Sequence, residues 1–228
     1  MDLVYKGKTK NVYKLSDGNY QLIFKDDVTG KDGVFDPGAN HVGLKMEGAG
    51  AAALALTQFF YTKLNKQGVP THFISANLAE NSMTVLPAKL FGKGVEVICR
   101  FKAVGSFLRR YGMYAKEAQD LDAFVEITLK DDDREDPPIT KDALVMLGIM
   151  SADEYETLVS LTKKIAHFVK NELKQKKLDL YDIKFEFGRV GADQHIALVD
   201  EISGGNMRAY QNGKYVDPLT VEKIMLGR

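Results

Sequence analysis

The sequence predicts an α+β protein, because strands fill its first part and strands mix with helices in the rest. Three observations support this prediction. Short alternating apolar segments occupy residues 3–25, an amphipathic helix with a clear start follows Ser151, and residues 180–188 include a strict alternation of apolar and charged side chains. No repeat or linker interrupts the chain, so we expect two lobes that share a cleft rather than two independent domains.

The composition indicates a globular protein without a general affinity for nucleic acids or membranes. The chain has 228 residues, of which 45% are hydrophobic, and its 31 basic residues balance 31 acidic ones. Selectivity for anions therefore has to be local. The single Cys99 excludes an intrachain disulfide, and the four scattered histidines lack the spacing of a zinc site. The sequence shows no transmembrane-length apolar run and no signal peptide, so we expect a soluble cytoplasmic protein.

The first elements follow from alternation and from helical spacing. We expect strands at residues 3–5, 12–15 and 20–25, and a turn-rich segment over residues 26–33. A Gly/Ala-rich stretch then leads into apolar residues that recur every three to four positions, and it predicts a helix closed by Gly68 and Pro70. These apolar residues are Leu54, Leu56, Phe59, Phe60 and Leu64.

The middle of the chain continues with strands and then a long helix. Strands are expected at residues 71–74, 83–86, 95–101 and 124–129, and the acidic run 131–136 before Pro137-Pro138 is expected to be a loop. Ser151 and Glu154 have the spacing of a capping box, and apolar residues recur from there to Leu173. This helix should pack on the sheet that carries residues 180–188.

The segment around Glu186 is the most informative part of the sequence. In a strand, Ile183, Phe185 and Phe187 face one side while Asp182, Lys184 and Glu186 face the other. Residues 191–194 indicate a turn and 195–202 a returning strand, so a hairpin register exists that places Asp200 near Glu186. Two adjacent carboxylates are typical of a Mg²⁺ site completed by nucleotide phosphates and water. The hypothesis depends on the register, because a shift by one residue would turn the two side chains to opposite faces.

Three further segments carry cations in patterns that suit anion binding. In Lys6-Gly7-Lys8-Thr9-Lys10, alternation would place all three lysines on one side of a ribbon that could cover a polyphosphate; an ordinary lysine-bearing edge strand is the alternative. Arg100 leaves a strand before the Gly105-Ser106 turn, which offers a guanidinium and helix amides to a phosphate or carboxylate. The alternative is that Ser106 is only a helix cap and Arg100 a solvated strand residue. Arg208 follows the glycine loop after Asp200, and an exposed loop arginine is the alternative there.

With these pieces in order, the chain resembles the SAICAR synthetase (phosphoribosylaminoimidazole-succinocarboxamide synthase) family over nearly its whole length. The resemblance is carried by Tyr5-Lys6-Gly7-Lys8-Thr9-Lys10, Asp32-Gly33, Glu96 with Arg100 and Gly105-Ser106, Asp136-Pro137, residues 182–188, and Asp200-Glu201 with Arg208. It implies an N-terminal β lobe similar to the small lobe of protein kinases, residues 1–88, and an ATP-grasp-like α+β lobe, residues 89–228, with ATP between them.

The resemblance also implies roles for individual residues. Lys8 and Lys10 match nucleotide-phosphate lysines, and residues 86–90 match the adenine-contacting connection, with Leu86, Ala88 and Lys89 as cofactor-binding residues. Arg100, Ser106 and Arg208 match the residues that hold the ribotide anions, and Asp32 is added to this substrate set. Glu186 and Asp200 match the Mg²⁺ ligands. Lys184 is expected beside the reacting group, and Lys130 and Asp136 match further catalytic positions.

The activity implied by this resemblance is an ATP-dependent amide ligation in purine biosynthesis. ATP phosphorylates the carboxylate of carboxyaminoimidazole ribotide (CAIR), and the amine of L-aspartate attacks the acyl phosphate to give SAICAR, ADP and phosphate. No enzyme nucleophile is needed, in agreement with the absence of a Ser-His-Asp or Cys-His pattern. The resemblance further implies a cytoplasmic homodimer with no nucleic-acid or membrane partner. Two departures from the family pattern are Gly204-Gly205 after Ser203 and a short C-terminal helix at residues 220–228.

Two other functions are compatible with a nucleotide cleft. A small-molecule kinase would release a phosphorylated acceptor and would give full ADP turnover without aspartate. A nucleotide-sensing protein without catalysis would keep its function when Glu186 is replaced by Gln, whereas the ligase would lose turnover.

Overall fold

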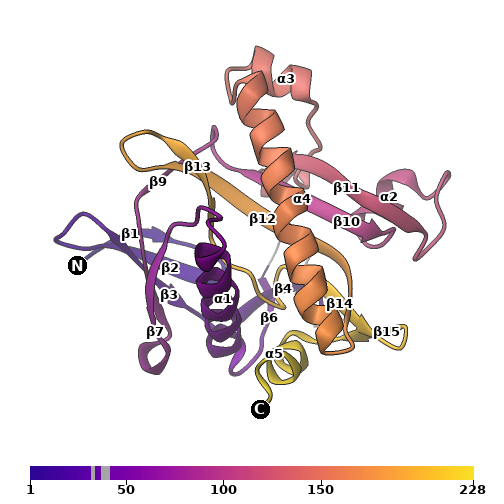
Figure 1. The fold of residues 1–228 in the computed structure, drawn as a ribbon, viewed down its shortest axis with the longest axis horizontal. Helices are drawn as coiled ribbons and strands as arrows, with labels where there is room; N and C mark the ends of the chain where they lie inside the picture. The colour runs from indigo at the N-terminus through magenta and orange to yellow at the C-terminus, as the bar shows by residue number, and fades with distance from the viewer. Residues whose placement is uncertain (32–33, 37–41) are drawn as a thin grey trace.

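The computed structural model describes residues 1–31, 34–36 and 42–228 and confirms the α+β fold (Figure 1). The N-terminal sheet consists of five antiparallel strands in the order β1-β2-β3-β8-β7. They are β1 (Asp2–Lys6), β2 (Lys10–Lys14), β3 (Tyr20–Phe24), β8 (Ser82–Val85) and β7 (Phe73–Asn77). A small antiparallel sheet of β4 (Asp27–Lys31), β5 (Val34–Phe35) and β6 (Val42–Lys45) extends this lobe.

The second, larger sheet is built around one long strand. Strand β12 (Asp179–Val190) is antiparallel to four neighbours, β10, β13, β14 and β9. The order is β11-β10-β12-β14-β15, and β13 and β9 pair with other stretches of β12. Their bounds are β9 (Ala88–Leu90), β10 (Val95–Lys102), β11 (Asp120–Leu129), β13 (His195–Val199), β14 (Met207–Gln211) and β15 (Lys214–Val216).

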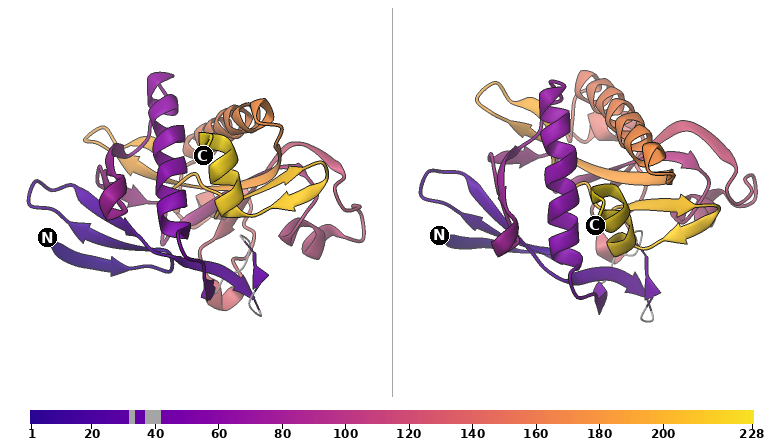
Figure 2. Two further views of the ribbon diagram at one scale, coloured as in Figure 1. Left: turned by 90° about the horizontal axis from the view of Figure 1, so that it is seen from below. Right: turned by 60° about the horizontal axis from the view of Figure 1, so that its bottom comes forward.

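The three longer helices lie on one side of the two sheets, opposite β4–β6 and the acidic loop (Figure 2). They are α1 (Ala49–Lys66), α4 (Ala152–Gln175) and α5 (Pro218–Leu226). Helix α4 packs on β12, β10 and β11, as predicted, and its Ser151–Glu154 capping box is formed. The shorter helices are α2 (Ser106–Tyr111), α3 (Lys141–Met146) and the single 3₁₀ turns η1 (Leu78–Glu80) and η2 (Asp132–Arg134).

The main hydrophobic core joins the two lobes through α1. Phe60 and Leu64 of α1 are fully buried together with Phe185 and Ile183 of β12 and with the apolar side of α4. Leu54, nearer the start of α1, instead packs into a second cluster on the N-terminal sheet. Because one helix contributes to both clusters, it fixes the angle at which the two sheets face each other across the cleft.

Most predicted elements are confirmed, but several segments differ from the sequence prediction. The turn expected at residues 26–33 is wrong for its middle part, because Asp27–Lys31 is strand β4. Val28 is buried, and β4 pairs with β6 so closely that a Cβ atom on Gly43 would clash with the backbone of Gly30. The strand expected at 71–74 lies at Phe73–Asn77. Helix α3 has no counterpart in the sequence prediction, although Thr140 caps it by accepting a hydrogen bond from the Ala143 amide.

No helix among the described residues combines the length and apolar character needed to cross a bilayer.

Candidate active site

A cleft of about 1390 Å³ lies between the N-terminal lobe and the open face of the large sheet. Strands β2, β10, β12 and β14, helix α2 and the loops after β11 and β13 all contribute residues to its lining. Ten of the predicted site residues line it, namely Lys8, Lys10, Arg100, Ser106, Lys130, Asp136, Lys184, Glu186, Asp200 and Arg208. The structure therefore gathers residues that are separated by up to two hundred positions in the sequence.

The lysines of the first motif do not share one side of a ribbon, which corrects the sequence prediction. The chain turns between β1 and β2, closed by a 2.8 Å hydrogen bond from the Gly7 amide to the Lys10 carbonyl. Lys6 lies outside the cleft lining, Lys8 reaches Asp132 of the acidic loop at 2.5 Å, and Lys10 points into the buried floor. The turn works because Gly7 leaves space that a Cβ atom would fill, 2.7 Å from the Lys10 carbonyl oxygen.

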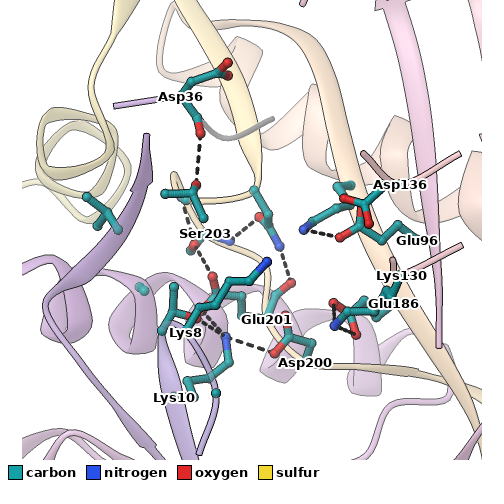
Figure 3. Close-up of a pocket in the computed structure, with 18 of the residues that line it drawn as sticks. Lys8, Lys10, Asp36, Glu96, Lys130, Asp136, Glu186, Asp200, Glu201 and Ser203 are labelled. Carbon is teal, nitrogen blue, oxygen red and sulfur yellow. Dashed lines mark hydrogen bonds and ion pairs between the residues drawn. The ribbon is translucent and has the colours of Figure 1, made fainter. Parts of the chain in front are cut away.

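Lys10 lies in an acidic pocket (Figure 3). Its ammonium is 2.9 Å from Asp200 and 3.0 Å from Glu201, and its side chain is only 9% exposed. Burial opposes the charged form, but the two carboxylates outweigh it and raise the pKa of Lys10. The same pairing overcomes the burial of Asp200 and lowers its pKa to about 2. Both groups therefore stay charged at neutral pH.

Glu186 and Asp200 line the same cleft, but not through a regular hairpin register. Glu186 lies opposite Val199, so a continuing strand would turn Asp200 to the other face. Strand β13 ends at Val199 instead of Ile202, and Asp200 adopts a left-handed conformation with φ of 66°. That kink places its carboxylate on the Glu186 side. Burial and the Asp200 charge raise the pKa of Glu186, against the effect of Lys130, whose ammonium lies 2.8 and 3.0 Å from its carboxylate oxygens.

The chemistry of this pair fits a divalent metal held mainly by phosphate and water. No cluster of three or more acidic, His or Cys side chains at metal-binding distance exists in the described part of the chain. Glu186 and Asp200 repel each other when both are ionised. In this structure Lys130 neutralises Glu186 and Lys10 neutralises Asp200. Mg²⁺ needs only one or two protein carboxylates beside nucleotide phosphates, so the donor set suits it.

Lys184 and Asp136 both lie near Glu96 in the cleft. The Lys184 ammonium contacts Glu96 of the neighbouring strand at 2.7 Å, and Glu96 and Glu186 outweigh burial to raise the pKa of Lys184. Asp136 accepts a 2.8 Å hydrogen bond from the Asp131 amide. Burial and the nearby Glu96 raise the pKa of Asp136.

The two predicted anion-binding arginines belong to one buried ion-pair chain. Asp182 Oδ2 accepts hydrogen bonds from Arg100 Nη1 at 3.0 Å and Arg208 Nη1 at 2.8 Å, and Arg208 Nη2 continues to Asp36 at 2.6 Å. Ser106 is not the cap of α2; that position is Gly105, and the Ser106 hydroxyl accepts a 2.9 Å bond from Arg100. Arg100 is 1% exposed, so it is not the solvated strand residue of the alternative interpretation.

The remaining predicted residues lie elsewhere. Leu86, Ala88 and Lys89 are on the connection that passes from β8 into β9, and they are not among the residues that line the cleft, whereas the adjacent Leu90 is. The backbone of β9 pairs with β12, and Ala88 lies against Gly188. Asp32 lies outside the described residues.

Several acidic residues that shape the site carry no clear signal in the sequence pattern. Glu201, Glu96, Asp182 and Asp36 line the cleft, and Glu126 lies just outside its lining. Two of them have only an indirect signal: Glu201 directly follows Asp200, and Glu96 shares the strand face of Arg100 by alternation. Nothing in the sequence pattern places Asp36 beside Arg208, because their contact spans 172 positions.

Comparisons with known proteins agree with this architecture. A family model described as SAICAR synthetase matches residues 3–224. The phosphoribosylaminoimidazole-succinocarboxamide synthase of Clostridium tetani is 66% identical over 226 residues, which cover 99% of this chain and 100% of that protein. The synthase of the same name from Thermotoga maritima strain MSB8 is 35% identical, with 93% and 87% coverage.

Solved structures of SAICAR synthetases have the same fold as this chain. A SAICAR synthetase in complex with ADP superposes with a TM-score of 0.85 at 27% identity, covering 99% of this chain and 98% of that one. The enzyme from Pyrococcus horikoshii gives a TM-score of 0.81 at 26% identity, with 96% and 98% coverage.

Proposed function

The chain belongs to the SAICAR synthetase family, and we propose that its cleft binds ATP, CAIR and L-aspartate for the reaction of that family. The protein is an ATP-dependent carbon–nitrogen ligase of de novo purine biosynthesis, which forms SAICAR, ADP and phosphate. The observation that carries this conclusion is the 66% identity over 99% of the chain. The cleft supports it, because cations and carboxylates converge there on one face of the large sheet.

The reaction needs neutralised phosphates more than it needs a protein nucleophile. Transfer of the γ-phosphoryl group to the CAIR carboxylate makes an acyl phosphate; the aspartate amine then attacks its carbon, and phosphate leaves as the amide forms. Lys8 and Lys10 of the N-terminal lobe are assigned to the nucleotide phosphates. Mg²⁺ held by Glu186 and Asp200 would neutralise phosphate charge, which lowers the cost of phosphoryl transfer.

The ion pairs of the cleft suggest how the ligands are accommodated. Lys10 now neutralises Asp200, and Lys130 neutralises Glu186. With Mg²⁺ and ATP bound, Glu186 and Asp200 would hold the metal, and Lys10 and Lys130 would pair with phosphates in place of these carboxylates. Each charge then keeps a partner, so the exchange avoids the large penalty of an unpaired buried ion.

The reacting carboxylate of CAIR is assigned to the space beside Lys184 and Lys130, whose ammonium groups can stabilise the charge on the acyl phosphate. Asp136 is assigned to accept a proton from the attacking amine, and its raised pKa makes it a better base than an ordinary aspartate. Arg100, Ser106 and Arg208 are assigned to the anionic groups of the ribotide. Adenine contacts from Leu86, Ala88 and Lys89 and a substrate contact from Asp32 stay predictions.

We also propose that residues 1–88 act as the nucleotide-covering lobe and that the enzyme works as a cytoplasmic homodimer on small-molecule substrates alone. The family resemblance supports the dimer. Light scattering should then give a mass twice that of the 25.4 kDa chain. A mass equal to one chain at assay concentrations would contradict it.

ADP release with all three substrates, and with each omitted in turn, tests the function. A ligase should release ADP at a substantial rate only when ATP, CAIR and aspartate are all present. Full ADP release without aspartate would identify a kinase instead.

Glu186→Gln tests the assignment of the metal-binding carboxylate. The variant should lose at least about a hundredfold in turnover, the scale of a missing electrostatic contact in a transition state. The matched control is Glu172→Gln, because Glu172 pairs with Lys63 at side-chain exposures of 14% and 42%, nearly those of Glu186 and Lys130 at 12% and 41%, but lies outside the cleft lining. Unchanged turnover in Glu186→Gln would refute the assignment.

A further inference from the structure

Glu126 of β11 is a buried carboxylate that accepts three side-chain hydrogen bonds but has no part in the reaction scheme. It is 6% exposed and is not among the residues that line the cleft. Its Oε2 accepts hydrogen bonds from Arg100 Nη2 at 2.8 Å and Arg110 Nη1 at 2.7 Å, and its Oε1 accepts one from the Tyr111 hydroxyl at 3.1 Å. Glu126 therefore lies beside Arg100 on the same face of the sheet, just outside the cleft lining.

Arg100 is held from three directions at once. Its Nη1 is bound by Asp182, and its Nη2 is shared between Ser106 and Glu126. Its Nε is buried without a hydrogen-bond partner in the described structure. A guanidinium that is 1% exposed cannot replace a lost partner with water, so its orientation depends on these three contacts.

We propose that Glu126 is a positioning residue for ribotide binding, which holds the guanidinium of Arg100 in the orientation that presents it to the substrate anion. This proposal rests on the function proposed above. Glu126 also holds Arg110, which lines the cleft beside Arg100, so one carboxylate fixes the spacing of two adjacent cations. Tyr111 anchors the second oxygen of the carboxylate and prevents its rotation.

The change in charge alone would predict tighter binding of CAIR when Glu126 is replaced. Removing the negative charge of Glu126 makes the cleft more positive, which would favour an anionic ligand. That gain is small, because the cleft is open to solvent and water screens the charge of a group that does not touch the ligand. Misorientation of Arg100 costs more, since paired hydrogen bonds from a planar guanidinium require a defined geometry. In Glu126→Gln, moreover, the amide oxygen can replace Oε2 as the acceptor from both guanidinium groups, but these hydrogen bonds are weaker because the acceptor has lost its charge.

The experiment compares Glu126→Gln, Glu126→Asp and Tyr111→Phe with the wild-type enzyme. We expect Glu126→Gln to raise the KM for CAIR about tenfold, as for a lost bond to a buried charge, with the KM for ATP nearly unchanged. Glu126→Asp keeps the charge but not the reach, so it should raise the same KM. Tyr111→Phe should cause a smaller rise in the same direction, and it serves as the test if both Glu126 variants fail to fold.

The control is Glu222→Gln in α5, another 6% exposed glutamate with an arginine partner, Arg228, and outside the cleft lining. It should leave both KM values unchanged. Calorimetric titration of CAIR without ATP or aspartate gives a readout that does not depend on turnover. Wild-type enzyme that binds CAIR but releases no ADP would refute the proposed function and leave this proposal intact.

Three results would overturn the proposal. A lower KM for CAIR in Glu126→Gln would mean that only the charge of Glu126 matters. Wild-type CAIR binding in both single variants, Glu126→Asp and Tyr111→Phe, would mean that the contacts of the carboxylate do not position Arg100. Equal rises in the KM values for CAIR and ATP would indicate a general loss of structure.

Discussion

At the scale of single residues, the cleft combines groups whose ionisation depends on their partners. Asp200 is half-buried and still ionises more readily than a free aspartate, with a pKa of about 2, because Lys10 and Lys130 outweigh its burial. His72 is buried near the same two residues, Lys10 and Asp200, but Asp200 does not offset the effect of burial on its pKa. Burial and the charge of Lys10 outweigh Asp200 and lower the pKa of His72 to about 4. A group that is neutral when folded and protonated when unfolded makes stability depend on pH.

His72 should make the protein less stable as the pH falls. Between its ordinary value of 6.5 and its folded value of about 4, the unfolded chain binds a proton that the folded chain excludes. Stability is therefore complete above this window and decreases as the pH falls through it. Urea unfolding near pH 5 should give a free energy of unfolding about 2 kcal/mol below that near pH 7.

The variant His72→Phe tests this origin. It keeps the ring that packs edge-on against Tyr61, with centroids 6.0 Å apart, but cannot titrate. Its overall stability can differ from wild type, whereas its loss between the two pH values should nearly disappear. The same loss in His72→Phe would assign the effect to another group.

Gly105 is expected to determine where Arg208 lies. A Cβ atom at this position would be 2.6 to 2.9 Å from three guanidinium atoms of Arg208, and the backbone has a φ of 57°. Gly105→Ala should therefore displace Arg208 and raise the KM for CAIR more than that for ATP. Gly213→Ala is the control, because Gly213 also has a positive φ, 75°, with open space around it.

Both glycine variants should lose about 1–2 kcal/mol of stability through backbone strain, but only Gly105→Ala should weaken CAIR binding. Chemical denaturation and steady-state kinetics separate the two effects. Equal KM values for CAIR in the two variants would show that Arg208 does not depend on Gly105.

At the scale of elements, the sequence predicted segments whose periodicity matches their structure. Strand β10, strand β12 and helix α4 were all expected, because each alternates or repeats over many residues and carries its own boundary signals. Strand β4 was missed because Asp, Gly and Lys favour turns locally, while pairing with β6 decides the outcome. Helix α3 is a short helix whose only clear signal is one capping threonine.

The two most important predicted site motifs both line the cleft, but their local geometry differs from the prediction. Asp200 was expected in a strand and reaches its place through a left-handed kink. The three lysines were expected on one ribbon face, but Lys8 lies in the turn between β1 and β2. In both cases the chain leaves the regular β conformation. Alternation rules cannot predict such a departure, because tertiary contacts with the other lobe stabilise it.

The turn between β1 and β2 should act on nucleotide binding rather than on stability. Lys8 and Asp132 are 40% and 44% exposed, so their contact across the cleft should contribute less than about 1 kcal/mol to folding. Lys8→Ala should leave the free energy of unfolding within that margin and raise the KM for ATP severalfold. Lys6→Ala, two positions away and outside the cleft lining, is the control and should change neither quantity.

Two results would contradict the assignment of Lys8 to nucleotide binding. If Lys6→Ala and Lys8→Ala raise the KM for ATP equally, the two lysines act through the general charge of the ribbon. That result would fit the prediction that all three lysines lie on one side of it. If neither raises it, the turn does not contact the nucleotide.

At the scale of the whole molecule, ion pairs rather than apolar contacts connect the facing surfaces of the cleft. Lys8 with Asp132, Lys10 with Asp200 and Glu201, and Arg208 with Asp36 each join the N-terminal lobe to the large sheet. These pairs lie far apart in the sequence, which is why sequence patterns pointed to the lysines, Asp200 and Arg208 but not to the partners Asp132, Glu201 and Asp36. Such an interface can exchange partners when charged ligands enter, whereas the hydrophobic core around α1 holds the lobes together.

This arrangement predicts that Mg²⁺ and ATP stabilise the fold together. At a nucleotide concentration a hundredfold above its Kd, the free energy of unfolding should rise by about 2.7 kcal/mol. With EDTA present, the same ATP concentration should stabilise the protein much less, because four phosphate charges would then face Glu186 and Asp200 without a metal between them. Thermal or urea unfolding with and without EDTA measures this metal-dependent increment.

The increment should depend on Glu186 itself. In Glu186→Gln, ATP with Mg²⁺ should stabilise the protein no more than ATP with EDTA, whereas Glu172→Gln should keep the full metal-dependent increment. Because this measurement needs neither CAIR nor aspartate, it tests the metal assignment separately from the ligase reaction. A wild-type increment in Glu186→Gln would place the metal on other ligands, and the exchange of ion pairs proposed for the cleft would then have to begin elsewhere than at Lys130.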